Sequence, residues 1–418
     1  MCVVPKRAET REGFRVIGMN KLEHFFFQAG VFVVLFHLFR NISEIYYLVL
    51  GFVLLGFLIL SFLHLNNNSF QKIFLIIAVS LAYVVFASLI TESTYSIAIG
   101  VARLFYLSPV IIYFFSKDFN NNEILIFWKI ILFFTVASSL SIFLQYFIGP
   151  IAWFADHSER AGTDRFASLA GSLTVYGSLV GVAIALSGFI YKQVAIYIAL
   201  IFLLCLGAFL SLQKMALFSM VLSITFVWAG SRNKISVLKA FFLLSGLIVT
   251  GLFLYFILLE YFSEHWTYIS LIFTADASAV GDVSVVNSII DRMTELPFEA
   301  FSYWGYLNGL LGVGVFGGSG GLGYPDLPMT HNLVAEVFLI FGLILGALIV
   351  FIIFKYLMVC FRFLLFPFNV RAKLASSSFS IVVLTSLFSG GLFYQPVIGL
   401  IFWFSLSELY KLSRNVKI

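Results

Sequence analysis

Residues 332–354 read NLVAEVFLIFGLILGALIVFIIF, and Glu336 is the only ionisable residue among them. A helix needs about 20 predominantly apolar residues to cross the roughly 30 Å hydrocarbon core of a bilayer. This stretch meets that requirement and therefore predicts a transmembrane helix. Comparable stretches recur along the chain, and residues 42–64 and 72–90 are among the clearest.

About twelve such apolar runs can be marked, with bounds set by the flanking polar residues. They cover residues 22–39, 42–64, 72–90, 97–116, 124–148, 167–190, 194–210, 214–229, 237–259, 332–354, 374–391 and 394–410. Of all residues 61% are hydrophobic and only 11% are charged, whereas a soluble chain carries about 25% charged residues. We therefore predict an all-α polytopic integral membrane protein with about twelve transmembrane helices.

Lysine and arginine are distributed unevenly between the two sides of this arrangement. With the N-terminus in the cytoplasm, the cytoplasmic segments hold 18 of the 25 and the opposite side holds 5, while Arg103 and Lys129 fall within runs. Cytoplasmic loops of membrane proteins carry such an excess, so both termini are predicted to be cytoplasmic. The basic residues form no patch, which argues against nucleic acid as a partner and leaves the lipid bilayer as the expected surroundings.

The runs divide the chain into three parts. Residues 1–260 hold the first nine predicted helices, residues 261–331 form one large loop on the outer side, and residues 332–418 hold the last three helices. Loops of this length are usually functional or disordered. The cysteines have no spacing typical of a metal site or a disulfide framework, and no nucleotide-binding motif appears, so no metal and no cofactor is predicted.

The cations on the outer side are the first candidates for function, because the outer loops should be poor in them. Arg160, Arg165, Lys214 and Arg292 all lie there. Arginine suits bidentate phosphate recognition, so several of these groups together would suit a lipid-linked diphosphate. The alternative is a structural role, in which the side chains extend to the membrane surface or pair with nearby carboxylates.

His331 is the sharpest single candidate. Thr330 is predicted to cap the helix that starts near residue 332, which places His331 at the helix N-terminus, where the dipole disfavours imidazolium. A neutral ring could act as a base; the alternative is an ordinary interfacial histidine. Glu336 lies further along the same helix and could orient a neighbour. Arg103, inside the fourth run, is predicted to be a buried charge, and such residues are functional candidates by default.

Two segments carry a resemblance to a known family. LNGLLGVGVFG at 307–317, followed by THNLVAEVFLIFG at 330–342, resembles the O-antigen polymerase and ligase superfamily, as does RFASLAG at 165–171. LSLQKMA at 210–216 stands where that family has a Ser-Arg pair. Gln213 and Lys214 replace this pair, which keeps the positive charge of the arginine and loses its planar, bidentate guanidinium.

The resemblance implies a glycosyltransferase of GT-C-like architecture in the bacterial inner membrane, with its active site facing the periplasm. It implies an inverting, metal-independent transfer of glycan from undecaprenyl diphosphate to another lipid-linked repeat unit, as an O-antigen polymerase of lipopolysaccharide biosynthesis. An O-antigen ligase acting on lipid A-core is the alternative, and a lipid-linked oligosaccharide flippase is the alternative of another class. A chain-length regulator protein is a further implied partner.

In this interpretation His331, Arg165 and Arg292 are catalytic. His331 serves as base or acceptor-orienting group, and the two arginines act with Lys214 as a diphosphate clamp. Arg160, Arg103 and Glu336 complete the predicted substrate-binding set.

Overall fold

The computed structural model describes residues 9–64, 68–91, 94–154, 158–160, 163–191, 193–211, 213–230, 291–317, 330–366 and 368–415. Its helices are α1 (Glu9–Leu35), η1 (His37–Asn41), α2 (Ile45–Phe62), α3 (Asn68–Thr91), α4 (Thr94–Phe105), α5 (Ser108–Ser116), α6 (Asn121–Ile148), α7 (Leu173–Ile190), α8 (Val194–Leu210), α9 (Lys214–Gly230), α14 (Glu295–Trp304), α15 (Tyr306–Leu311), η3 (Gly314–Gly317), α16 (Leu333–Leu365), α17 (Val370–Ser386) and α18 (Pro396–Asn415). One short antiparallel hairpin accompanies them, β1 (Ser158–Arg160) with β2 (Thr163–Arg165). The helical fold class is confirmed for these residues.

Six of the described helical segments are long and apolar enough to cross a membrane: 45–62, 70–90, 97–116, 121–148, 173–190 and 333–365. The shorter helices α8 and α9 are apolar as well. Only 17% of the apolar stretch in α2 and 22% of that in α3 is buried, and residues such as Phe52 and Phe86 face outward. Exposed apolar surface costs about 25 cal/mol per Å² in water, so lipid is the medium that suits this surface.

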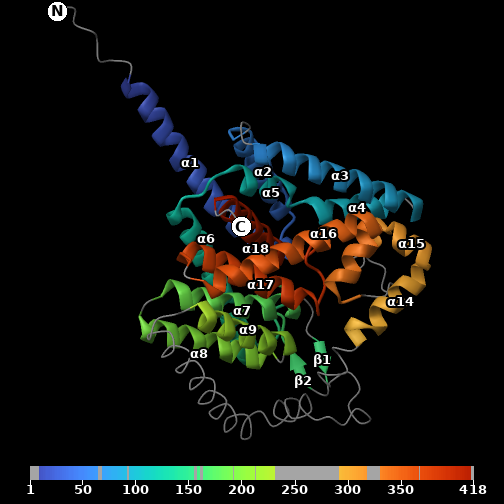
Figure 1. The fold of residues 1–418 in the computed structure, drawn as a ribbon. Helices are drawn as coiled ribbons and strands as arrows, with labels where there is room; N and C mark the ends of the chain where they lie inside the picture. Colours follow the sequence, from blue (N-terminus) through green and yellow to red (C-terminus); the bar gives the residue numbers. More distant parts are fainter. Residues whose placement is uncertain are drawn as a thin grey trace, which may run out of the picture.

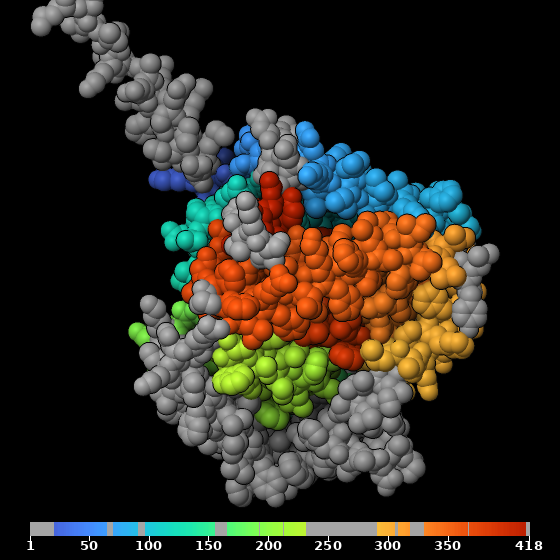
Figure 2. All heavy atoms as spheres, in the orientation of Figure 1, coloured from blue at the N-terminus to red at the C-terminus, as the bar shows by residue number. Residues whose placement is uncertain are grey.

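The long helices lie side by side in layers (Figure 1). Helices α7, α8 and α9 form one side, α2 to α5 form the other, and α16 and α17 lie between them. Helix α17 contacts α7, α16 and α18, which makes it the centre of the bundle. Figure 2 shows α16 covering the middle of one face, between α3 and α9.

Small residues let α7 and α9 approach closely. The Ser219 hydroxyl donates to the Gly177 carbonyl at 2.6 Å, and the Ser223 hydroxyl donates to the Gly181 carbonyl at 2.6 Å. A Cβ atom on Gly181 would lie 2.6 Å from the Ser219 Cβ. This is the packing expected between membrane helices, where close backbone approach and interhelical hydrogen bonds replace the hydrophobic effect.

Two predicted runs are interrupted helices. The run at 97–116 is α4 and α5 with a break at Tyr106 and Leu107, because Pro109 in the first turn of α5 cannot continue a preceding helix. The run at 332–354 extends to Leu365 and is broken at Gly342, which has φ 67° and ψ 179°. The predicted run 237–259 lies outside the described residues.

Residues 313–317 of the predicted outer loop are packed into the bundle. Val313, Val315 and Phe316 are at most 3% exposed, and the Val313 amide donates to the Leu339 carbonyl of α16 at 2.6 Å. The Tyr83 hydroxyl of α3 donates to the Leu311 carbonyl at 2.5 Å. The Val313 amide therefore satisfies a carbonyl next to the break in α16, where the helix cannot supply the donor itself.

Candidate functional site

The start of α16 is fixed by Asn332. Its Oδ1 accepts from the amides of Val334 at 2.9 Å and Ala335 at 3.1 Å, and its Nδ2 donates to the Arg292 carbonyl at 3.1 Å. The prediction that Thr330 caps this helix is wrong. The reason is that Asn332 has the extended backbone of an N-cap, from which a short side chain reaches the second and third helical amides.

His331 directly precedes this cap and has φ 45°, the only positive φ at a non-glycine residue in the described ranges. Such a backbone conformation costs an L-residue roughly 1–2 kcal/mol, and strained positions of this kind cluster at functional sites. Burial lowers the pKa of His331, and the nearby positive charge of Arg292 lowers it further, against a smaller opposing contribution from a hydrogen bond with the Ser389 backbone. The imidazole is therefore neutral at pH 7 and can accept a proton.

Arg292 reaches the C-terminal end of α17. Its Nη1 donates to the Phe388 carbonyl at 2.6 Å, two residues past the last residue of that helix. A cation at a helix C-terminus is stabilised by the helix dipole. Because the His331 ring bonds to the backbone of Ser389, the residue after Phe388, this contact places the guanidinium near His331.

Glu336 is fully buried, and its Oε2 accepts from the Gly391 amide at 2.6 Å. Gly390 and Gly391 have φ 63° and 74° and form the turn between α17 and α18. Arg292, His331 and Glu336 therefore all bind the backbone of residues 388–391. The sequence did not predict this turn as the common partner of the three side chains.

Arg165 ends strand β2 and is buried. Its Nη2 donates to the Gln213 Oε1 at 2.6 Å. Gln213 lies between α8 and α9, immediately before Lys214, and a Cβ on Gly177 would come within 3.2 Å of its Cγ. Gly177 thus leaves the space that Gln213 occupies, and Gln213 fixes the position of the Arg165 guanidinium.

The segment that follows Arg165 is held from α6. The Gln145 Nε2 donates to the Ala167 carbonyl at 2.7 Å, and the Tyr146 ring packs edge-on against Phe166 with centroids 4.9 Å apart. Both ends of the outer loop that carries Arg165 are therefore anchored, because the Ile151 amide donates to the Gln145 Oε1 at 3.2 Å.

These two groups lie at the same end of the bundle, which we call the outer end: α7, α9 and α16 begin there and α17 ends there (Figure 1). The rings of Phe218 and Phe388 are 5.6 Å apart, and the Ser178 hydroxyl donates to the Thr385 hydroxyl at 2.8 Å. Phe218 is one helical turn after the half-buried Lys214. The structure thus brings Arg165, Lys214, Arg292, His331 and Glu336 to one end of the molecule.

One predicted residue, Arg103, does not join this group in the described structure. Arg103 is exposed on the last turn of α4, so the prediction that it is buried is wrong; its long side chain extends from the helix surface instead. Arg160 lies on β1 opposite Thr163 in the hairpin.

Sequence reasoning missed several residues that shape the site. The N-cap role of Asn332 could have been read from its residue type and position. No sequence signal predicted the contacts that Gln213 and Gln145 make, because their partners lie 48 and 22 residues away. Among the described residues, no group of three or more His, Cys, Asp or Glu side chains could hold a metal ion.

Comparison with known proteins finds no matching protein family, no matching curated protein and no matching solved structure.

Proposed function

We propose that this chain is an inverting membrane glycosyltransferase that polymerises lipid-linked glycan repeat units at the outer face of the bacterial inner membrane. The proposal includes the finer expectations from the sequence: about twelve spans, a GT-C-like architecture, cytoplasmic termini and a periplasmic site. The observation that carries it is the gathering of Arg165, Lys214, Arg292 and a neutral His331 at the outer end.

The cations suit the leaving group of this reaction. When the bond between the anomeric carbon and the diphosphate breaks, negative charge grows on the departing oxygens. Fixed positive groups aimed at such charge are commonly the largest single contribution to catalysis. Arg165 is fixed by Gln213 and Arg292 by the Phe388 carbonyl. A guanidinium has five N–H donors, so a contact that fixes its orientation is compatible with phosphate binding.

His331 suits the proton transfer. The acceptor hydroxyl oxygen attacks the anomeric carbon from the side opposite the diphosphate, and the hydroxyl proton passes to the imidazole as the new glycosidic bond forms. A general base must be unprotonated at the working pH, and the lowered pKa of His331 meets that condition. The family-like motifs at 165–171, 307–317 and 330–342 support the same assignment.

Deletion of the gene tests the proposal at the level of the cell surface. Loss of a polymerase leaves a single repeat unit on the lipid A-core, whereas loss of a ligase or of a flippase leaves no repeat unit there. Surface polysaccharide separated by gel electrophoresis distinguishes these results. An unchanged polysaccharide ladder would contradict all three assignments.

A further inference from the structure

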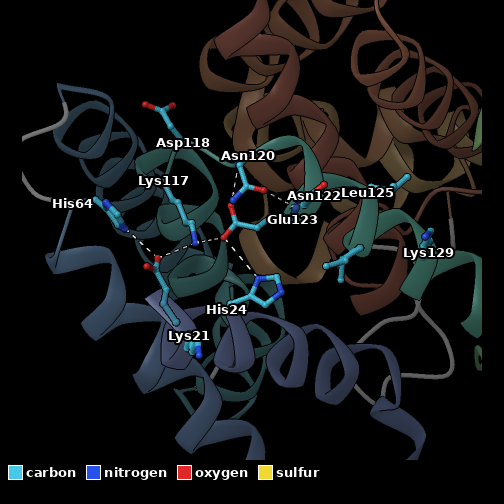
Figure 3. Close-up of a pocket in the computed structure, with 12 residues that line it drawn as sticks. Lys21, His24, His64, Lys117, Asp118, Asn120, Asn122, Glu123, Leu125 and Lys129 are labelled. Atoms are coloured by element: carbon cyan, nitrogen blue, oxygen red, sulfur yellow. Dashed lines mark hydrogen bonds and ion pairs between the residues drawn. The ribbon is translucent and has the colours of Figure 1, made fainter. Parts of the chain in front are cut away.

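The opposite end of the bundle, where α5 ends and α6 begins, holds a cavity of about 840 Å³. We call it the inner cavity and this end the inner end; the charge distribution predicts that it faces the cytoplasm. Helix α1, the end of α2, the α5–α6 connection and the first turns of α6 line it (Figure 3). Its volume lies within the range of about 300–1,000 Å³ that is typical of ligand sites, and no part of the proposed reaction uses it.

The two buried carboxylates of the inner cavity are already engaged. The Lys117 Nζ lies 3.1 Å from the Glu23 Oε1 and 2.7 Å from the Glu123 Oε1. His64 Nε2 is 3.2 Å from the same Glu23 oxygen, and the Tyr113 hydroxyl donates to it at 3.0 Å. Lys117 balances one of the two negative charges, and both carboxylates already accept hydrogen bonds from the wall.

Two lysines of the inner cavity are not engaged in this way. Lys21 on α1 and Lys129 on α6 are exposed, and neither forms an ion pair with a described residue. In Figure 3 both stand apart from the network around Lys117, and the Asp118 carboxylate points away from that network. Among the exposed charged groups that line the inner cavity, Lys21 and Lys129 are positive and Asp118 is negative, so positive charge is in excess among them.

The wall formed by α1 continues as an apolar groove. Lys21, Phe25 and Ala29 are spaced by four residues, so they share one face of the helix. Phe25 and Ala29 line a groove of about 340 Å³ between α1 and α2, together with residues such as Phe52. A polar cavity with a lysine at its edge thus leads into an apolar groove along the same helix face.

We propose that the inner cavity binds the headgroup of an anionic phospholipid, with the phosphate beside Lys21 and one acyl chain in the groove along Phe25 and Ala29. Lys129 adds a second positive charge across the cavity. Basic pockets between membrane helices on the cytoplasmic side are suited to acidic headgroups, and the lysine stems can lie along apolar surface while the ammonium groups remain at the headgroup level.

Lipid titration of the full-length chain followed by native mass spectrometry tests this proposal. The purified protein is titrated with phosphatidylglycerol, with phosphatidylcholine and, separately, with glycerol 3-phosphate. The variants are Lys21→Gln, Lys21→Gln with Lys129→Gln, and Lys72→Gln as a control, because Lys72 is an exposed lysine near the start of α3 and outside the cavity. A lysine near an anionic headgroup contributes roughly a fivefold change in affinity.

We expect phosphatidylglycerol to bind in preference to phosphatidylcholine, about fivefold more weakly to Lys21→Gln and about 25-fold more weakly to the double variant, with Lys72→Gln unchanged. Equal binding by the wild type and the double variant would overturn the proposal. So would an equal loss in Lys72→Gln, which would indicate a general surface charge effect. Glycerol 3-phosphate binding as tightly as the lipid would show a soluble-anion site instead.

Discussion

Replacement of His331 gives the most informative single perturbation of the proposed reaction. A general base contributes about 10²- to 10⁴-fold to the rate, so His331→Ala should slow chain extension by that factor. The structural cost is smaller: the ring loses a hydrogen bond with the Ser389 backbone, worth about 0.5–1.5 kcal/mol. The φ of 45° is unfavourable for alanine, whereas asparagine tolerates it better. His331→Asn should therefore fold nearly as well as the wild type and still lack a base.

The pH dependence separates a base from a structural histidine. Because the pKa of His331 lies below its ordinary value of 6.5, the wild-type rate should stay level as the pH falls from 8 to 6.5 and decline only below that. The unfolded chain takes up this proton first, at about pH 6.5, so the stability contribution of the neutral ring is present above that pH and decreases below it. His331→Asn should lose both effects.

The assay is the initial rate of chain extension by purified protein in proteoliposomes supplied with lipid-linked repeat units, measured at several pH values. Thermal unfolding of each variant in detergent serves as the control for folding. If His331→Asn extends chains at more than a tenth of the wild-type rate with the same pH profile, His331 is not the base and the proposed proton transfer is wrong.

Three further predictions concern other parts of the molecule. Arg165→Ala should reduce the rate about 10- to 100-fold, since a hydrogen bond to a charged group is worth about 1.5–3 kcal/mol, and Arg165→Lys should restore only part of it; equal rates for all three proteins would remove Arg165 from the site. Gly342→Ala should lower the unfolding temperature, because the residue has a φ of 67° and a Cβ there would meet the Tyr83 hydroxyl and lie 2.6 Å from the Leu311 carbonyl oxygen. Gly51→Ala is the control and should leave the unfolding temperature unchanged, because a Cβ on Gly51 would have nothing within 4 Å. A cysteine introduced at exposed Glu44 should react with a membrane-impermeant thiol reagent added from outside, and one at exposed Asp118 should stay protected in intact cells; the reverse pattern would refute the predicted orientation.

The helical fold class could be predicted from the sequence because lipid imposes a simple rule on composition. An apolar run long enough to cross the bilayer has to be helical, since its backbone groups have no water to bind. The breaks inside runs could not be predicted equally well. Pro109 signals the break between α4 and α5, but Gly342 resembles Gly346, only four residues later, which stays helical. Only the contact with Leu311 and its neighbours distinguishes the two glycines.

The sequence predicted the charged residues of the candidate site, and the structure shows the hydrogen-bond partners that hold their side chains in place. Arg165, Arg292 and His331 could be selected because cations are unusual on the outer side and because His331 precedes an apolar helix. Their partners are a side chain and backbone carbonyls that are distant in sequence, such as Gln213 and Phe388. A carbonyl at the end of α17 has no signature in the sequence, so such contacts required the tertiary structure.

Chain extension by the purified protein alone decides whether this chain is the polymerase. Proteoliposomes that contain only this protein are supplied with an undecaprenyl-diphosphate-linked repeat unit, without added metal and with a chelator present, and the products are separated by size. We expect a ladder of lipid-linked products with one, two and more added units, which disappears in the Arg165→Ala, Arg292→Ala double variant. A wild-type protein that folds and binds the substrate, but leaves every repeat unit single, would contradict the polymerase assignment.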